Sequence, residues 1–190
     1  YTNSGTLIGD AVEAGFIGLP TKGAELTSAH QALVTQLRNG VSYGPGDENV
    51  PWRFPEDLSR ALRDFLSTAR ALPGAEGESE LAAKVEYLCV QYLSRSYLGT
   101  FEIAREQPGT YLGQDERLLL PAIDSELQAI EDQSDPQVTK LQTRWSYLRA
   151  ALADMNSQSN TLQSVSGRPF APITVDRHAR SMTAQWMEMF

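Results

Sequence analysis

The chain has 190 residues, a formal net charge of −8 and a hydrophobic share of 41%. A chain of this length can bury a sizeable core without disulfides or a structural metal, and we expect one domain over residues 1–190. The negative charge disfavours binding to nucleic acid or to an anionic membrane surface. Cys89 is the single cysteine and there are two histidines, so neither an intramolecular disulfide nor a zinc site is expected, and no cofactor is predicted.

No apolar run approaches the roughly 18 residues of a membrane span, so no membrane contact is expected within this segment. The chain begins at Tyr1 rather than at a methionine. We therefore expect a processed product or a piece excised from a larger protein, in which membrane helices could flank the segment.

Glycine and proline divide the chain into segments whose apolar residues recur at three- and four-residue steps, the pattern of amphipathic helices. A short, weak helix is predicted at 5–16. Stronger helical segments are predicted at 24–38, 55–72, 79–107, 115–132, 136–155 and 175–190. Strand signals are poor, and the predicted fold is all-α: a helical bundle of five main helices plus short pieces, with two long loops at 39–55 and 156–174.

The clearest helix is 136–155, which Asp135 can cap and Pro136 can begin. Its apolar residues form one seam: Val138, Leu141, Trp145, Leu148, Leu152 and Met155. This seam predicts a helix with one face in the core.

The stretch 87–101, YLCVQYLSRSYLGTF, is the most apolar long stretch of the chain and has Arg95 in its middle. Continued as a helix to about Gln107, it places Arg95 on its only polar strip. Arg95 is then either solvated or paired with Glu102, or it is a buried anchor for a ligand carboxylate. In the second case Tyr92 or Tyr97 would complete a cavity between helices.

The string 166–186 gathers basic residues in an acidic chain, close to the predicted start of the last helix at Thr174. Helix N-termini carry partial positive charge and free N–H donors, so Arg168 and Arg177 form a second candidate anion site. The alternative is that these arginines form an ordinary solvated face. Phe170, between two prolines, is predicted to hold the loop against the core.

The motifs of the common catalytic classes are missing from the sequence. There is no G-x-S-x-G elbow, no phosphate-binding glycine loop and no Glu-x-x-His pair, and we predict no catalytic residue. Cys89 lies between Leu88 and Val90 and is interpreted as a small core hydrophobe. An enzymatic role would require the loop 39–55 to supply Asp47, Glu48 or Trp52 to the chemistry.

These observations favour a non-enzymatic helical bundle that senses or binds a small polar or anionic molecule. A periplasmic or extracellular sensor-type domain, acting in signal transduction, is slightly favoured over a cytoplasmic one. The alternative is an assembly or interaction protein, such as a secretion-system, scaffold or filament subunit, that docks partner helices or copies of itself. Its docking surface would be the apolar end WMEMF at 186–190.

Overall fold

The computed structural model describes residues 20–43, 48–72, 79–99, 101, 109–155, 157 and 164–190. In these ranges the chain forms six helices and no strands, so the predicted all-α helical bundle is confirmed, and each of the six stronger predicted segments corresponds to one helix. The weak helix predicted at 5–16 lies outside the described residues.

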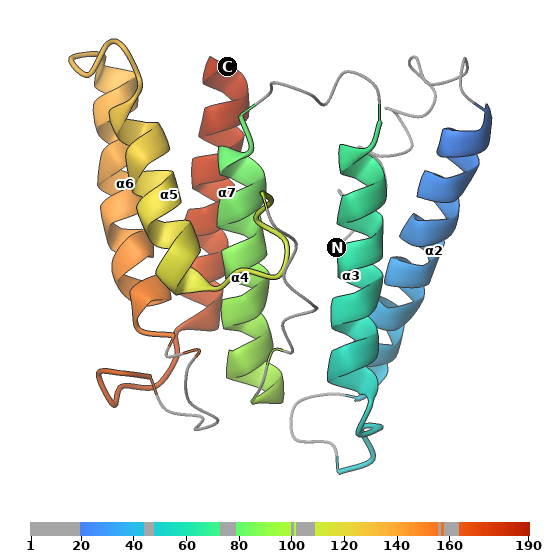
Figure 1. Ribbon diagram of the computed structural model, residues 1–190. Coiled ribbons are helices and arrows are strands. Elements are labelled where there is room, and N and C mark those ends of the chain that lie inside the picture. The colour runs from blue at the N-terminus through green and yellow to red at the C-terminus, as the bar shows by residue number, and fades with distance from the viewer. Residues whose placement is uncertain are drawn as a thin grey trace. The chain divides into compact units, whose positions relative to one another are not determined.

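The helices are shown in Figure 1. Their bounds are α2 Pro20–Tyr43, α3 Phe54–Arg70, α4 Leu81–Leu98, α5 Glu116–Gln128, α6 Pro136–Ala153 and α7 Pro172–Met189. Helices α2 and α3 belong to one compact unit, and α4 to α7 belong to a second. The single domain over 1–190 stays a prediction.

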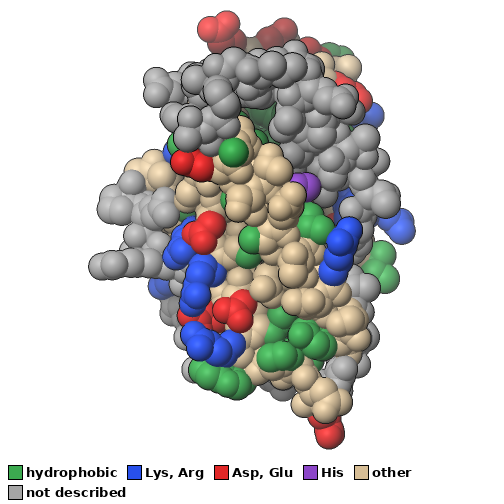
Figure 2. All heavy atoms as spheres, turned by 90° about the vertical axis from the view of Figure 1, so that its right-hand side faces the viewer, with side chains coloured by type: hydrophobic (Ala, Val, Ile, Leu, Met, Phe, Trp, Pro, Cys, Tyr) green, Lys and Arg blue, Asp and Glu red, His purple; other side chains and the backbone are tan. Residues whose placement is uncertain are grey.

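The first unit is a helical hairpin in which α2 packs along α3. Among the side chains of these two helices that the structure describes, the buried ones are Leu26, Leu33, Phe54 and Ser59. The apolar spacing of α3 places Leu58, Leu62 and Phe65 on one stripe, and this stripe is covered only in part, because all three residues are half-buried. Figure 2 shows the face at the right-hand side of Figure 1, where hydrophobic side chains lie among other side chains and exposed backbone, and basic and acidic side chains lie next to each other.

A close approach between the two helices of the hairpin depends on Gly40. A Cβ atom at this position would lie 2.7 Å from Cζ of Phe54, closer than side chains normally come. Phe54 is buried and also meets the Tyr43 ring edge-on, at 5.2 Å between centroids. The glycine therefore makes room for the ring that closes this end of the hairpin.

The second unit is a four-helix bundle with a closed core. All six residues of the predicted seam of α6 are buried, and Asp135 caps the helix by accepting a hydrogen bond from the Gln137 amide at 2.7 Å. In α7, the predicted apolar stripe is Val175, Met182, Trp186 and Met189, of which the first three are buried and Met189 is half-buried. The amphipathic pattern of these helices is thus confirmed.

Polar side chains join neighbouring helices of this bundle. Asp124 of α5 accepts from Trp145 Nε1 of α6 at 2.7 Å and from Arg149 Nε at 2.9 Å. The other links are the Lys84–Glu126 pair between α4 and α5, Thr183 to Glu86 between α7 and α4, and Arg144 to Gln185 and Gln185 to the Gln137 carbonyl between α6 and α7. These pairs fix which helix lies beside which.

The predicted end of the helix at 79–107 is wrong. Instead of continuing to about Gln107, α4 ends at Leu98, because Gly99 adopts the left-handed conformation with φ of 78°. Its amide donates to the Arg95 carbonyl at 3.1 Å, which is a common way to close a helix. Residues 102–108 lie outside the described residues.

Neither long loop is confirmed as predicted. Helix α2 runs on to Tyr43, so the connection to α3 spans 44–53, of which 48–53 are described. Helix α7 begins at Pro172, earlier than the predicted 175, and the connection before it spans 154–171. Within the described residues, no helix is long and apolar enough to cross a membrane.

Candidate functional site

The polar strip of α4 is buried in its second half. Gln91 and Arg95 of this strip are 1% and 7% exposed, and Ser94, which the spacing places on the neighbouring stripe of the helix, is 8% exposed. The expectation that Arg95 is solvated is therefore wrong. The alternative, a pair with Glu102, is not tested, because Glu102 lies outside the described residues. A buried arginine is uncommon in proteins, because its charge must be compensated after it leaves water.

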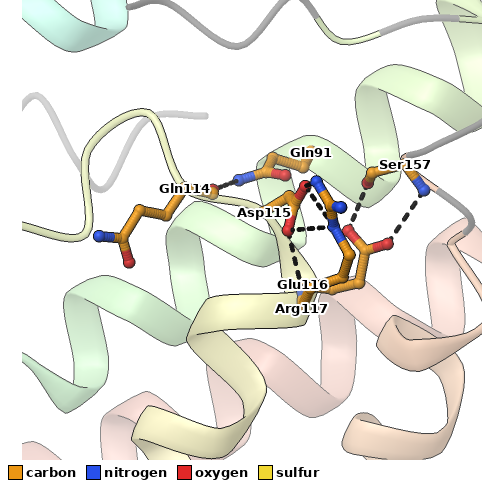
Figure 3. Close-up of polar contacts among 6 residues, drawn as sticks. All are labelled: Gln91, Gln114, Asp115, Glu116, Arg117 and Ser157. Carbon is orange, nitrogen blue, oxygen red and sulfur yellow. Dashed lines mark hydrogen bonds and ion pairs between the residues drawn. The ribbon is translucent and has the colours of Figure 1, made fainter. Parts of the chain in front are cut away.

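Gln91 joins this strip to the start of α5 (Figure 3), since its Nε2 donates to the Gln114 carbonyl at 2.8 Å. The next residue, Asp115, caps α5 by accepting from the Arg117 amide at 3.0 Å and also pairs with the Arg117 guanidinium. Glu116 accepts from the amide of Ser157 at 3.0 Å and from its hydroxyl. Both carboxylates are buried, so a polar layer adjoins the strip on α4.

Tyr92 links α4 to the segment that leads into α7. Its hydroxyl accepts from the Ala171 amide at 3.0 Å, and its ring meets Phe170 edge-on, at 5.1 Å between centroids and 90° between planes. The prediction that Phe170 holds this loop against the core is confirmed. Burial raises the pKa of the Tyr92 hydroxyl and the Ala171 amide partly offsets that effect, so the group stays a neutral phenol.

The predicted site residues fall into two environments. Tyr92 and Arg95 are buried, whereas Tyr97, on the same helix, is 51% exposed and does not join them. Arg168 and Arg177 are exposed. The contact between Tyr92 and residues 170–171 brings the segment that follows Arg168 next to α4.

Asp154 and two serines interact with the segment that contains Arg168. Burial raises the pKa of Asp154, but hydrogen bonds from Ser166 and Ser164 and the charge of Arg168 together hold it below its usual value. The Ser164 hydroxyl donates to the Arg168 carbonyl at 2.6 Å. This network gives the segment a defined shape in front of α7.

Cys89 is 1% exposed in the middle of α4, which agrees with its interpretation as a small core residue. Burial, followed by the nearby carboxylates of Glu86 and Asp176, raises the pKa of its thiol to about 12. Among the described residues, no group of His, Cys, Asp and Glu gathers in a way that could hold a metal ion.

Two further surface features belong to the hairpin unit and its connection. Trp52 is exposed, with the Arg53 guanidinium 5.3 Å from its ring centroid, and Glu48 is exposed as well. Asp47 lies outside the described residues. A shallow depression of about 230 Å³, lined by Glu25, Ser67, Thr68 and Ala71, includes none of the predicted site residues.

Sequence reasoning missed the polar layer beside α4. A signal for part of it was present, since Asp115 directly follows a glycine-rich turn and precedes an apolar periodic stretch, the usual position of a helix cap. The contact of Glu116 with Ser157 had no such signal, because those residues are far apart in the sequence.

No family model, curated protein or solved structure matches the chain. The candidate site therefore has to be judged from its own geometry.

Proposed function

We propose that the chain is a non-enzymatic binding domain whose four-helix unit holds a small polar or anionic molecule beside the polar strip of α4. The observation that carries the proposal is the burial of Arg95 together with Gln91 and Ser94. A guanidinium, an amide and a hydroxyl are the donors that bind a carboxylate or a similar oxyanion, and a buried guanidinium binds it more strongly than an exposed one.

The setting that we propose is a sensor-type domain outside the cytoplasm, acting in signal transduction. Tyr92 supports a signalling role, because it lies one helical turn from Arg95 and contacts the segment that begins α7. A molecule held by Arg95 would thereby lie close to the contact between α4 and the start of another helix. The single cysteine, which needs no partner, is compatible with this location.

The experiment is a thermal-unfolding screen of the full chain with acetate, succinate, phosphate and sulfate as anions and acetamide as a neutral probe. We expect at least one anion to raise Tm in proportion to the logarithm of its concentration above Kd, because a ligand that binds only the folded state stabilises it by mass action. Arg95→Gln should abolish this rise while the protein stays folded.

The matched control is Arg177→Gln on the exposed side of α7, which should leave the response unchanged. If Arg95→Gln does not fold, Arg95→Lys keeps the charge but not the planar donor geometry, and we expect it to weaken the response. An anion response that is equal in the wild type and in a folded Arg95 variant would contradict the proposal.

The second candidate function is docking of partner helices or self-association through α7. The observation that favours it is the exposure of Met187 and Phe190, at 73% and 70%, beside Trp186, whose ring centroid lies 4.4 Å from that of Phe190. Sedimentation velocity over a range of concentrations tests this candidate. Association that Met187→Glu abolishes would support it, and a monomer at all concentrations would exclude self-association.

A further inference from the structure

Glu86 of α4 faces α7 across the contact between the two helices. Its Oε1 accepts a hydrogen bond from the Thr183 hydroxyl of α7 at 2.7 Å, and its side chain is largely removed from water. A carboxylate in this position loses hydration that one hydrogen bond does not fully replace. The charged form is therefore the costly one.

The Thr183 hydroxyl has a second acceptor, because its oxygen lies 3.2 Å from the Arg180 carbonyl. A hydroxyl donates one hydrogen bond and accepts others. With Glu86 ionised, Thr183 donates to the carboxylate. With Glu86 protonated, the acid donates to the Thr183 oxygen and the hydroxyl turns to the Arg180 carbonyl, so the same three groups are satisfied in both states.

The charged groups around Glu86 do not cancel the effect of burial on its pKa. On α7, the charge of the Arg180 guanidinium lowers the pKa of Glu86. Asp176, which pairs with that guanidinium at 2.9 Å, raises the pKa of Glu86. On α4, Cys89 carries a neutral thiol, since burial raises its pKa to about 12. Towards α5, Lys84 of α4 is engaged by Glu126.

We propose that Glu86, Thr183 and the carbonyl of Arg180 form a proton-binding joint between α4 and α7, which holds the two helices together more tightly when Glu86 is protonated. Burial raises the pKa of the Glu86 carboxyl, and the hydrogen bond from Thr183 and the charge of Arg180 offset only part of that effect. The folded state then binds the proton more tightly than the unfolded state. The resulting stabilisation is complete below the ordinary pKa of 4.5 and is lost as the pH rises through the raised value.

The direct test is a carboxyl ¹³C NMR titration of the full chain between pH 3 and 8. We expect the Glu86 resonance to titrate with a midpoint above pH 4.5, and a midpoint one pH unit higher corresponds to about tenfold tighter proton binding. Thr183→Val removes the hydrogen bond from both forms of Glu86, and it should move the midpoint further up, because a hydrogen bond to the charged carboxylate is the stronger of the two. A Glu86 midpoint at or below 4.5 would overturn the proposal.

A second measurement follows Tm against pH for the wild type and Glu86→Gln, which resembles the protonated form. We expect the variant to melt higher than the wild type at pH 8 and the difference to vanish towards pH 4. Glu131→Gln, at an exposed position after α5, is the control and should follow the wild type throughout. Parallel curves of Tm against pH for the wild type and Glu86→Gln would contradict the joint. This measurement does not depend on whether an anion binds Arg95.

Discussion

The hairpin α2–α3 and the bundle α4–α7 both carry apolar residues at helical spacing but have different cores. In the hairpin the apolar stripe of α3 stays half-buried, and the ion pairs described are local, such as Arg60 with Glu56 and Arg63 with Asp64. In the bundle the seam of α6 is fully buried and polar side chains bridge neighbouring helices. Periodicity therefore indicates which face of a helix is apolar, whereas the number of neighbours decides how far that face is buried.

The largest expected effect contrasts Leu148→Ala in α6 with Leu62→Ala in α3. Leu148 is fully enclosed and Leu62 is half-buried. We expect a loss of about 2–5 kcal/mol in the free energy of unfolding for the first variant and about 1 kcal/mol for the second, because only the enclosed site leaves a cavity. Urea denaturation measures both, and equal losses would remove the distinction between the two cores.

An intermediate effect is expected from the carboxylates. Asp124→Ala removes the acceptor of Trp145 Nε1 and Arg149 across two helices, whereas Asp64→Ala removes a partner of the adjacent Arg63. We expect about 1–3 kcal/mol for the first and less than about 0.5 kcal/mol for the second, since exposed local pairs contribute little. The same urea titrations decide, and a loss for Asp64→Ala as large as that for Asp124→Ala would contradict this ranking.

The smallest effect is expected for Tyr92→Phe, which removes the acceptor of the Ala171 amide but keeps the ring against Phe170. A cost of about 0.5–1.5 kcal/mol should come with faster hydrogen exchange of the amide at 171. Tyr97→Phe is the control, because that side chain is half exposed. If exchange at 171 is the same in both variants, the tyrosine does not hold the segment before α7.

Much of the fold followed from local patterns in the sequence. The seam of α6 and its cap at Asp135 were predictable because three- and four-residue spacing and a capping residue before proline act within one helix. The end of α4 at Leu98 does not follow from the apolar spacing, which continues past Gly99, because the helix is ended by the left-handed conformation of that glycine.

The site was less predictable than the helices. The polar strip with Arg95 was found from spacing, but its burial depends on which segments cover it, and that is a property of tertiary structure. The same holds for Glu86 and Thr183, which are remote in sequence and meet only because α4 packs against α7. By contrast, the contact of Phe170 could be predicted from the two prolines that fix the chain around it.

Residue-resolved amide hydrogen exchange of the full chain tests most directly that α4 lies within a closed core while the hairpin is open. We predict that amides of α4, including those at Gln91 to Arg95, exchange as slowly as those of α6 and only through global opening of the bundle, whereas α2 and α3 exchange faster through local opening. Amides at Gln91 to Arg95 that exchange as fast as those of the hairpin would contradict the enclosure of the strip and, with it, the proposed binding site.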